Sequence, residues 1–177
     1  VVSPAPSEQT GIALGDVNGD HVPDVIISSA TNPGIADSIV VGVLASDGRG
    51  GLLAPLTYAM DERSSAVAAT DLDGDGYVDL VLTSTNSIDI AFGSGEGRFD
   101  PLVRYPVNGP SGTVSVADLS GDGLADLVVR SAAGVSVLRG RGNGTVLNSV
   151  ESSVTVASGF VAGDLGGDGK PDLVVAD

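Results

Sequence analysis

The chain lacks the side chains on which several kinds of functional site depend. Its 177 residues include no cysteine, no tryptophan and one histidine, and aromatic residues make up only 3%. Without cysteine there is no disulfide framework and no thiolate ligand for a soft metal. A Ser–His–Asp or Cys–His arrangement is nearly excluded, because the one histidine, His21, lies within an acidic loop.

Basic residues are also few. Eight Lys and Arg residues stand against 23 Asp and Glu, and the formal net charge is −15. The basic residues are scattered along the sequence without forming a cluster, and such a chain would repel a polyanion, so we expect no nucleic-acid partner. The longest apolar run is far shorter than a bilayer requires, so we expect no membrane span.

The chain does contain a nine-residue acidic loop that occurs four times. Loops one to four begin at Asp16, Asp71, Asp118 and Asp164, so successive copies start 55, 47 and 46 residues apart. A short apolar segment rich in Val, Leu and Ile follows each copy. A motif that recurs at this spacing is one fixed part of a larger repeated unit.

Each loop has the composition of a cation site. The side chains at its first, third and fifth positions alternate around a glycine turn and point inward, and the ninth position returns another carboxylate. All these donors are oxygens, which hard cations prefer, so calcium is the expected ion at up to four sites. The side chains predicted as ligands are Asp16, Asn18, Asp20 and Asp24 in loop one; Asp71, Asp73, Asp75 and Asp79 in loop two; Asp118, Ser120, Asp122 and Asp126 in loop three; and Asp164, Asp168 and Asp172 in loop four.

The loops differ most at the third position. Loop two has Asp73 there, whereas loop four has Gly166 and would need a water molecule as ligand. Because affinity rises with ligand charge, loop two should bind calcium most tightly and loop four most weakly. The sixth position is glycine in three loops, where a positive φ is expected, and His21 in loop one. Thirteen of the 23 acidic residues occupy ligand positions, so four calcium ions would bring the net charge from −15 to −7.

Other interpretations of the loop fit less well. An EF-hand or dockerin loop needs an acidic twelfth residue and helical flanks, whereas the twelfth residues here are apolar. RTX arrays repeat their units back to back, and these loops are far apart in the sequence. An aspartate–glycine hairpin without metal is credible for one copy, but four copies with the ninth aspartate intact favour a metal site.

Four short strands are predicted in each repeated unit. The first precedes the loop and the second follows it as an apolar run that should be buried on both faces. A third strand leads into a glycine turn, and a fourth contains prolines that suit a sheet edge. The predicted ranges are 11–14, 66–70, 114–117 and 160–163 for first strands; 24–27, 79–82, 126–129 and 172–175 for second strands; 39–44, 88–92 and 135–138 for third strands; and 52–58 and 99–105 for the clearest fourth strands.

This pattern predicts an all-β fold, a β-propeller of four-stranded antiparallel blades with a calcium loop in one hairpin of each. A parallel β-helix is the alternative, but its coils are shorter and need no tight hairpin. The units span about 10–63, 64–111, 112–156 and, incompletely, 157–177, and residues 1–9 align with the tail of a preceding blade. We therefore expect about three and a half blades in one domain, with missing blades or self-association completing the ring.

The acidic loops, the DLVV-type strands and the segment FGSGEGRF at residues 92–99 together resemble FG-GAP or VCBS repeats. Such repeats form integrin α-subunit heads and occur in many secreted bacterial proteins. The resemblance covers nearly the whole chain and implies a propeller that is usually seven-bladed, with calcium in the hairpin between the first two strands of a blade. It also implies a backbone carbonyl ligand at the seventh loop position, from Val22, Tyr77, Leu124 and Lys170.

The resemblance and the lack of catalytic groups favour a non-enzymatic module that binds a protein or carbohydrate, as in adhesion. Weak calcium loops need the millimolar calcium found outside cells, so a secreted or cell-surface location is expected. A non-catalytic propeller domain of a larger secreted enzyme is the alternative. Glycosidase carboxylates could come from Glu62, Asp89, Glu96 or Asp100, but each is more simply a turn or surface residue. Aromatic side chains such as Tyr58 and Phe99 could line a sugar site, although at strand ends they more often pack between blades.

Overall fold

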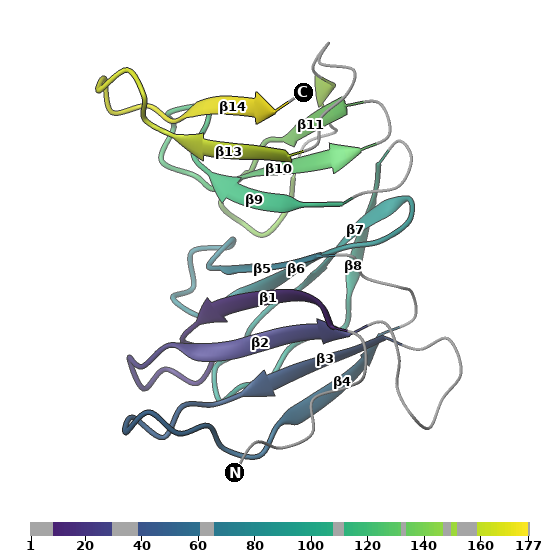
Figure 1. Cartoon of the computed structure of the whole chain (residues 1–177), viewed down its shortest axis with the longest axis vertical. Helices are drawn as coiled ribbons and strands as arrows, with labels where there is room; N and C mark the ends of the chain where they lie inside the picture. Colours follow the sequence, from purple (N-terminus) through teal and green to yellow (C-terminus); the bar gives the residue numbers. More distant parts are fainter. Residues whose placement is uncertain are drawn as a thin grey trace.

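The computed structural model describes residues 9–29, 39–60, 66–107, 112–131, 134–146, 150–151 and 159–176. Within these residues the chain is all-β and has no helix. Three four-stranded antiparallel sheets and one two-stranded sheet follow one another along the sequence (Figure 1). No described segment forms a helix long and apolar enough to cross a membrane.

In every sheet the strands pair in chain order, each with the next. Sheet one contains β1 (Gln9–Gly15), β2 (Asp24–Ser29), β3 (Ile39–Leu44) and β4 (Leu56–Met60). Sheet two contains β5 (Ala66–Thr70), β6 (Asp79–Thr83), β7 (Ser87–Ala91) and β8 (Val103–Pro106). Sheet three contains β9 (Val114–Ala117), β10 (Asp126–Ser131), β11 (Gly134–Leu138) and β12 (Val150–Glu151), and sheet four contains β13 (Gly159–Gly163) and β14 (Asp172–Ala176).

The sheets stack on one another along the long axis of the molecule (Figure 1). Their first strands are neighbours, since β1 lies beside β5, β5 beside β9, and β9 beside β13. Each sheet therefore occupies the same place relative to the one before it, as expected for a structure built from repeats.

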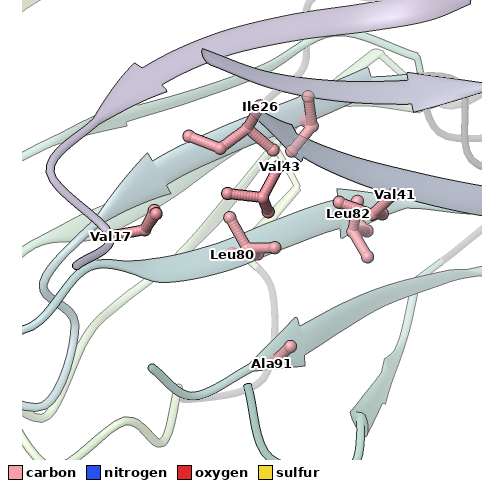
Figure 2. Close-up of a cluster of buried hydrophobic side chains, with 8 residues drawn as sticks. Val17, Ile26, Val41, Val43, Leu80, Leu82 and Ala91 are labelled. Carbon is pink, nitrogen blue, oxygen red and sulfur yellow. The ribbon is translucent and has the colours of Figure 1, made fainter. Parts of the chain in front are cut away.

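The hydrophobic core lies between the sheets. One cluster joins sheet one to sheet two and includes Ile26 and Val41 on one side and Leu80 on the other (Figure 2). A second cluster joins sheets two and three through residues such as Val81 and Leu127. Every residue of β6 is buried, because alternate side chains enter the two clusters. The prediction that the second strand is buried on both faces is confirmed for β6.

The same prediction is wrong for β14. Its residues alternate between exposed and half-buried, and Val174 is 41% exposed although it follows the same DLVV pattern. The physical reason is that β14 pairs only with β13 and, in the part of the chain that the structure describes, no further sheet covers its outer face. An apolar run thus predicts a strand, while its burial depends on the neighbouring sheets.

The fourth strands begin later than predicted. β4 and β8 begin after Pro55 and Pro101, which cannot donate a ladder hydrogen bond. The residues before each proline instead close the preceding turn, through isolated bridges of Leu52 with Ser46 and Phe99 with Gly93. β4, β8 and β12 each lie at an edge of their sheet, as predicted. The predicted tail of a preceding blade at residues 1–9 lies outside the described residues, apart from the first residue of β1.

Candidate metal centre

Each acidic loop joins the first strand of a sheet to the second. The loops gather on the left side of the molecule in Figure 1, together with the turns between the third and fourth strands. We call these turns the glycine turns; isolated bridges bound them at residues 46–52, 93–99 and 140–146. Two kinds of loop from each complete sheet therefore lie on one side of the stack.

The first aspartate organises the loop backbone. In loop three, Asp118 accepts hydrogen bonds from the N–H groups of Gly121 and Gly123, both at 2.7 Å, and from Asp122 at 3.1 Å. Desolvation raises the pKa of Asp118, but these N–H groups outweigh it and hold the pKa below its usual range. The first aspartates of loops one and four accept the same three hydrogen bonds.

The sixth position has the predicted left-handed backbone. Gly76, Gly123 and Gly169 have φ values of 90°, 85° and 83°. His21 adopts a φ of 65°, so loop one has the same backbone although its sixth residue is not glycine. The His21 ring is exposed, with Nδ1 3.7 Å from Asp16 Oδ2. Glycine at the fourth position also has a positive φ in every loop, a requirement that the sequence reasoning missed although the residue is present in all four copies.

Loop two brings three carboxylates together. Oxygens of Asp71, Asp73 and Asp79 lie within 4.8 Å of one another, the one such group of acidic or histidine side chains among the described residues. Two oxygens on opposite sides of a calcium ion, each about 2.4 Å from it, would be about 4.8 Å apart, so one ion could bind all three. Asp75 is not in this group; it is exposed, and its Oδ1 accepts a hydrogen bond from Tyr77 N at 2.8 Å.

The electrostatics of loop two also fit a cation. Burial raises the pKa of Asp79, against the lowering effect of hydrogen bonds from the backbone N–H groups of Gly93 and Leu72. The nearby charges of Asp73 and Asp75 raise this pKa further. Negative charge at this site is therefore unfavourable without a counter-charge, and a divalent cation would supply one.

The ninth aspartate has a structural role that the sequence reasoning missed. Asp79 is fully buried and accepts hydrogen bonds from Leu72 N to Oδ2 and from Gly93 N to Oδ1, both at 2.8 Å. It therefore ties loop two to the glycine turn of the same sheet. Each carboxylate oxygen has further lone pairs, so this role is compatible with binding a cation.

The same connection occurs in sheets one and three. Asp24 accepts from Val17 N at 3.1 Å and from Ser46 N at 2.8 Å. Asp126 accepts from Ser120 N at 3.0 Å and from Gly140 N at 2.9 Å. In loop four, Asp172 is exposed and, within the described part of the chain, accepts from the loop residues Leu165 and Gly166.

A sequence signal for this connection exists in the glycine turns. A Cβ atom on Gly93 would lie 2.2 Å from the carbonyl oxygen of Val78, and one on Gly140 would lie 2.0 Å from that of Ala125. No side chain fits at such a distance, so glycine is required where the turn meets the end of its loop in sheets two and three. Ser46 occupies the equivalent position in sheet one. In the sequence analysis, the Phe92–Gly93 pair served only to support the resemblance to FG-GAP repeats. In the structure, Gly93 is the residue that contacts the loop.

The seventh residues lie where their backbone can contribute to the site. The N–H groups of Val22, Tyr77, Leu124 and Lys170 each donate to the fifth-position aspartate of their own loop, at 2.8–3.0 Å. Their carbonyl oxygens as cation ligands stay a prediction, as does full ligation of loops one, three and four.

Two other sequence candidates have structural partners. Asp89 is buried and binds Arg104 through two hydrogen bonds, of 2.9 and 3.1 Å, across β7 and β8. Tyr58 and Phe99 form an edge-to-face pair with ring centroids 5.5 Å apart, packed against the cluster between sheets one and two. These two rings therefore pack between sheets, which was the predicted alternative to lining a sugar site. Glu62 lies outside the described residues.

The FG-GAP-like repeat family matches residues 71–129 and 118–175, more than half of the chain. The chain belongs to this family. Each match begins at an acidic loop and ends in the strand after the next loop, so the FG-GAP-like pattern includes the glycine turn between them. Sheet one lies outside the matched residues but has the same loop, turn and ninth-aspartate connection.

Solved structures are similar to the FG-GAP-like chain over most of its length, whereas no curated protein matches it. One is an Agrocybe aegerita lectin that recognises non-reducing terminal N-acetylglucosamine, with a TM-score of 0.68 and 16% identity. Another is the V. cholerae biofilm matrix protein Bap1, with a TM-score of 0.55 and 25% identity. The alignments cover 95% of this chain in both cases, but 47% of the lectin and 27% of the matrix protein. The chain thus spans about half or less of these proteins, and its likeness to the lectin shows the fold alone.

Proposed function

We propose that this FG-GAP-like chain is a calcium-stabilised segment of an extracellular β-propeller, with a non-enzymatic role in binding a protein or a glycan. The observation that carries the proposal is the convergence of Asp71, Asp73 and Asp79 in loop two. Three carboxylates at this separation repel one another unless a cation lies between them.

The arrangement of the sheets supports the propeller. Each complete sheet is a four-stranded antiparallel meander, which is the form of a propeller blade. Successive sheets pack face to face with their first strands adjacent, as blades do around a central axis. The similarity in fold to the lectin, over 95% of this chain, agrees with this arrangement.

The donor set supports calcium as the ion. In loop two the side chains of Asp71, Asp73 and Asp79 would hold it, with Asp75 and the carbonyl of Tyr77 as the further predicted ligands. A bound calcium ion supplies structural stabilisation, because it binds the folded loop and scarcely the unfolded chain. Loops one, three and four each offer three acidic side chains and would bind more weakly than loop two.

The loops and turns on one side of the stack leave other surfaces for a partner. Two observations support a binding role: one protein of similar fold recognises N-acetylglucosamine, and another belongs to a biofilm matrix. The expected weak binding supports an extracellular location, because calcium reaches millimolar concentrations outside cells. Calcium would then maintain the shape of the module while a partner binds elsewhere.

Calorimetric titration with calcium tests the metal site. We expect binding to the wild-type chain, and a loss of the tightest site in the double variant Asp71→Asn/Asp73→Asn. Asp100→Asn is the matched control, since it removes an exposed charge outside the loops. Equal binding by the double variant and the control would contradict the assignment of the site.

A glycan array with N-acetylglucosamine-terminated probes, run in calcium and in chelator, tests the partner class. We expect binding that requires calcium. Matrix proteins arrayed beside the glycans distinguish the two kinds of partner, and the absence of calcium-dependent binding to either would contradict the proposed role.

A further inference from the structure

We propose that the metal loops of successive sheets are coupled in series. A cation bound in one loop orders the glycine turn of the next sheet and thereby tightens cation binding in that sheet's own loop. This inference rests on the proposed calcium binding. The second residue of the loop and the ninth aspartate are the positioning residues that carry the coupling.

The first connection lies within one sheet. Asp79 Oδ2 accepts the Leu72 N–H, and Asp79 Oδ1 accepts the Gly93 N–H. One buried carboxylate thus fixes the second residue of loop two and the start of the glycine turn. A cation that holds this carboxylate in one orientation also holds both backbone groups.

The second connection runs between sheets. The carbonyl of Leu72, in loop two, accepts a hydrogen bond of 3.3 Å from Gly144 N in the glycine turn of sheet three. The carbonyl of Val17, in loop one, accepts one of 2.8 Å from Gly97 N in the glycine turn of sheet two. The peptide at the second loop position therefore links its own aspartate to the following sheet.

Packing reinforces this second connection. The side chains of Val17 and Leu72 are 3% and 6% exposed, and each enters the core cluster shared with the following sheet. A Cβ atom on Gly144 would lie 2.2 Å from the ring of Phe92, so the turn of sheet three is seated closely on sheet two. The Tyr58 hydroxyl also donates to the carbonyl of Gly97, which holds the turn of sheet two against sheet one.

The glycine turns are compact enough to join the two connections. The turn of sheet two is closed by the Gly93–Phe99 bridge and by a hydrogen bond of 3.0 Å from Ser94 N to Arg98 O. Gly93, its first residue, is hydrogen-bonded to Asp79 of loop two. Gly97, near its tip, is hydrogen-bonded to Val17 of loop one. An unbroken path thus runs from Asp24 through Val17 and the turn of sheet two to Asp79, and from there through Leu72 and the turn of sheet three to Asp126.

Loop four offers an internal comparison. Its second residue, Leu165, is 72% exposed, and among the described residues no glycine turn donates to its carbonyl. Removing a ligand from loop four should therefore leave the turn of sheet three unchanged, whereas removing one from loop two should not. Asp73 and Asp168 suit this comparison, because neither carboxylate belongs to the hydrogen-bonded path.

Amide hydrogen exchange, followed by NMR with and without calcium, tests the coupling. In the wild-type chain we expect calcium to slow exchange at Gly144 by about tenfold or more. In Asp73→Ala the slowing of Gly144 exchange by calcium should be smaller by at least about fivefold. Exchange at Gly140, which donates to Asp126, should still be slowed by calcium nearly as much as in the wild type. Calcium titration followed at the Gly123 amide of loop three should show an affinity about fivefold or more weaker in Asp73→Ala. In the control Asp168→Ala all three glycines should respond as in the wild type.

Calorimetry on the same samples separates the two claims. If the wild type binds no calcium, the proposed function is overturned and the coupling with it. If calcium binds but its effect on Gly144 and on loop three is the same in Asp73→Ala as in the wild type, the coupling alone is overturned.

Discussion

The buried carboxylate of Asp79 accepts a hydrogen bond from the backbone N–H of Gly93, with 2.8 Å between Oδ1 and N. The equivalent pair in sheet three, Asp126 and Gly140, is joined at 2.9 Å. The ninth aspartate of the loop is therefore both a candidate cation ligand and the acceptor that attaches the loop to its sheet. These two roles can be separated by substitutions at different positions of one loop.

Asp79→Asn should destabilise the protein even in chelator, by about 1–3 kcal/mol. An amide has one acceptor oxygen, so either Leu72 N or Gly93 N would face an NH₂ group and lose its partner. Asp73→Asn should leave stability in chelator unchanged, because Asn can still accept from Asp75 N. Urea unfolding in chelator measures both; equal stability of the two variants would contradict a structural role for Asp79.

Gly93→Ala should destabilise the protein by about 1–3 kcal/mol or more, because the new methyl group would overlap the carbonyl oxygen of Val78 at 2.2 Å. Gly163→Ala is the control, since a Cβ atom there meets nothing within 4 Å. Thermal unfolding of the two variants gives the comparison. A wild-type melting temperature for Gly93→Ala would show that the turn can move away from its loop without cost.

Ile26→Ala should cost about 2–5 kcal/mol of unfolding free energy, because Ile26 is fully buried between sheets one and two. Ile12→Ala, on the adjacent strand, should change stability by less than about 1 kcal/mol, because Ile12 is 67% exposed. Denaturant unfolding of both variants tests the packing of the sheets. Similar losses would mean that the face of β1 bearing Ile12 is covered in solution.

Asp75→Ala should reduce the calcium-dependent part of the stability more than Asp168→Ala. Loop two has four acidic side chains, whereas loop four has three and a glycine at the third position. The quantity to compare is the rise in melting temperature between chelator and saturating calcium. Equal reductions would show that ligand charge does not rank the sites.

Much of the local structure could be predicted from the sequence. The bounds of β5 and β9 agree with the predicted ranges, and the sixth residue is left-handed in the three loops where it is glycine, as predicted. Both follow from local chemistry, namely alternating apolar residues and the conformational freedom of glycine. Pro55 and Pro101 also predicted edge strands, but the strands begin only after them because proline lacks the donor that pairing needs.

Contacts between sheets could not be predicted in this way. The hydrogen bond from Gly144 to Leu72 joins two different repeats, and it depends on how sheet three packs on sheet two. Asp79 is buried and Asp172 is exposed, although both are ninth residues of nearly identical loops, because their burial also depends on how the sheets pack. Likewise, the motif predicts both Asp73 and Asp75 as ligands. In the folded loop, the carboxylate of Asp73 lies close to those of Asp71 and Asp79, whereas Asp75 is not part of this group.

Thermal unfolding in saturating calcium and in chelator tests the central claim most directly. A site that binds only the folded chain contributes about 2.7 kcal/mol when calcium is a hundredfold above its dissociation constant. For a chain of this length, one such site should raise the melting temperature by about 5–10 °C, and further sites should add to this. The account predicts a rise of at least this size for the wild type, which magnesium at the same concentration should reproduce poorly. The same melting temperature in calcium and in chelator would contradict it.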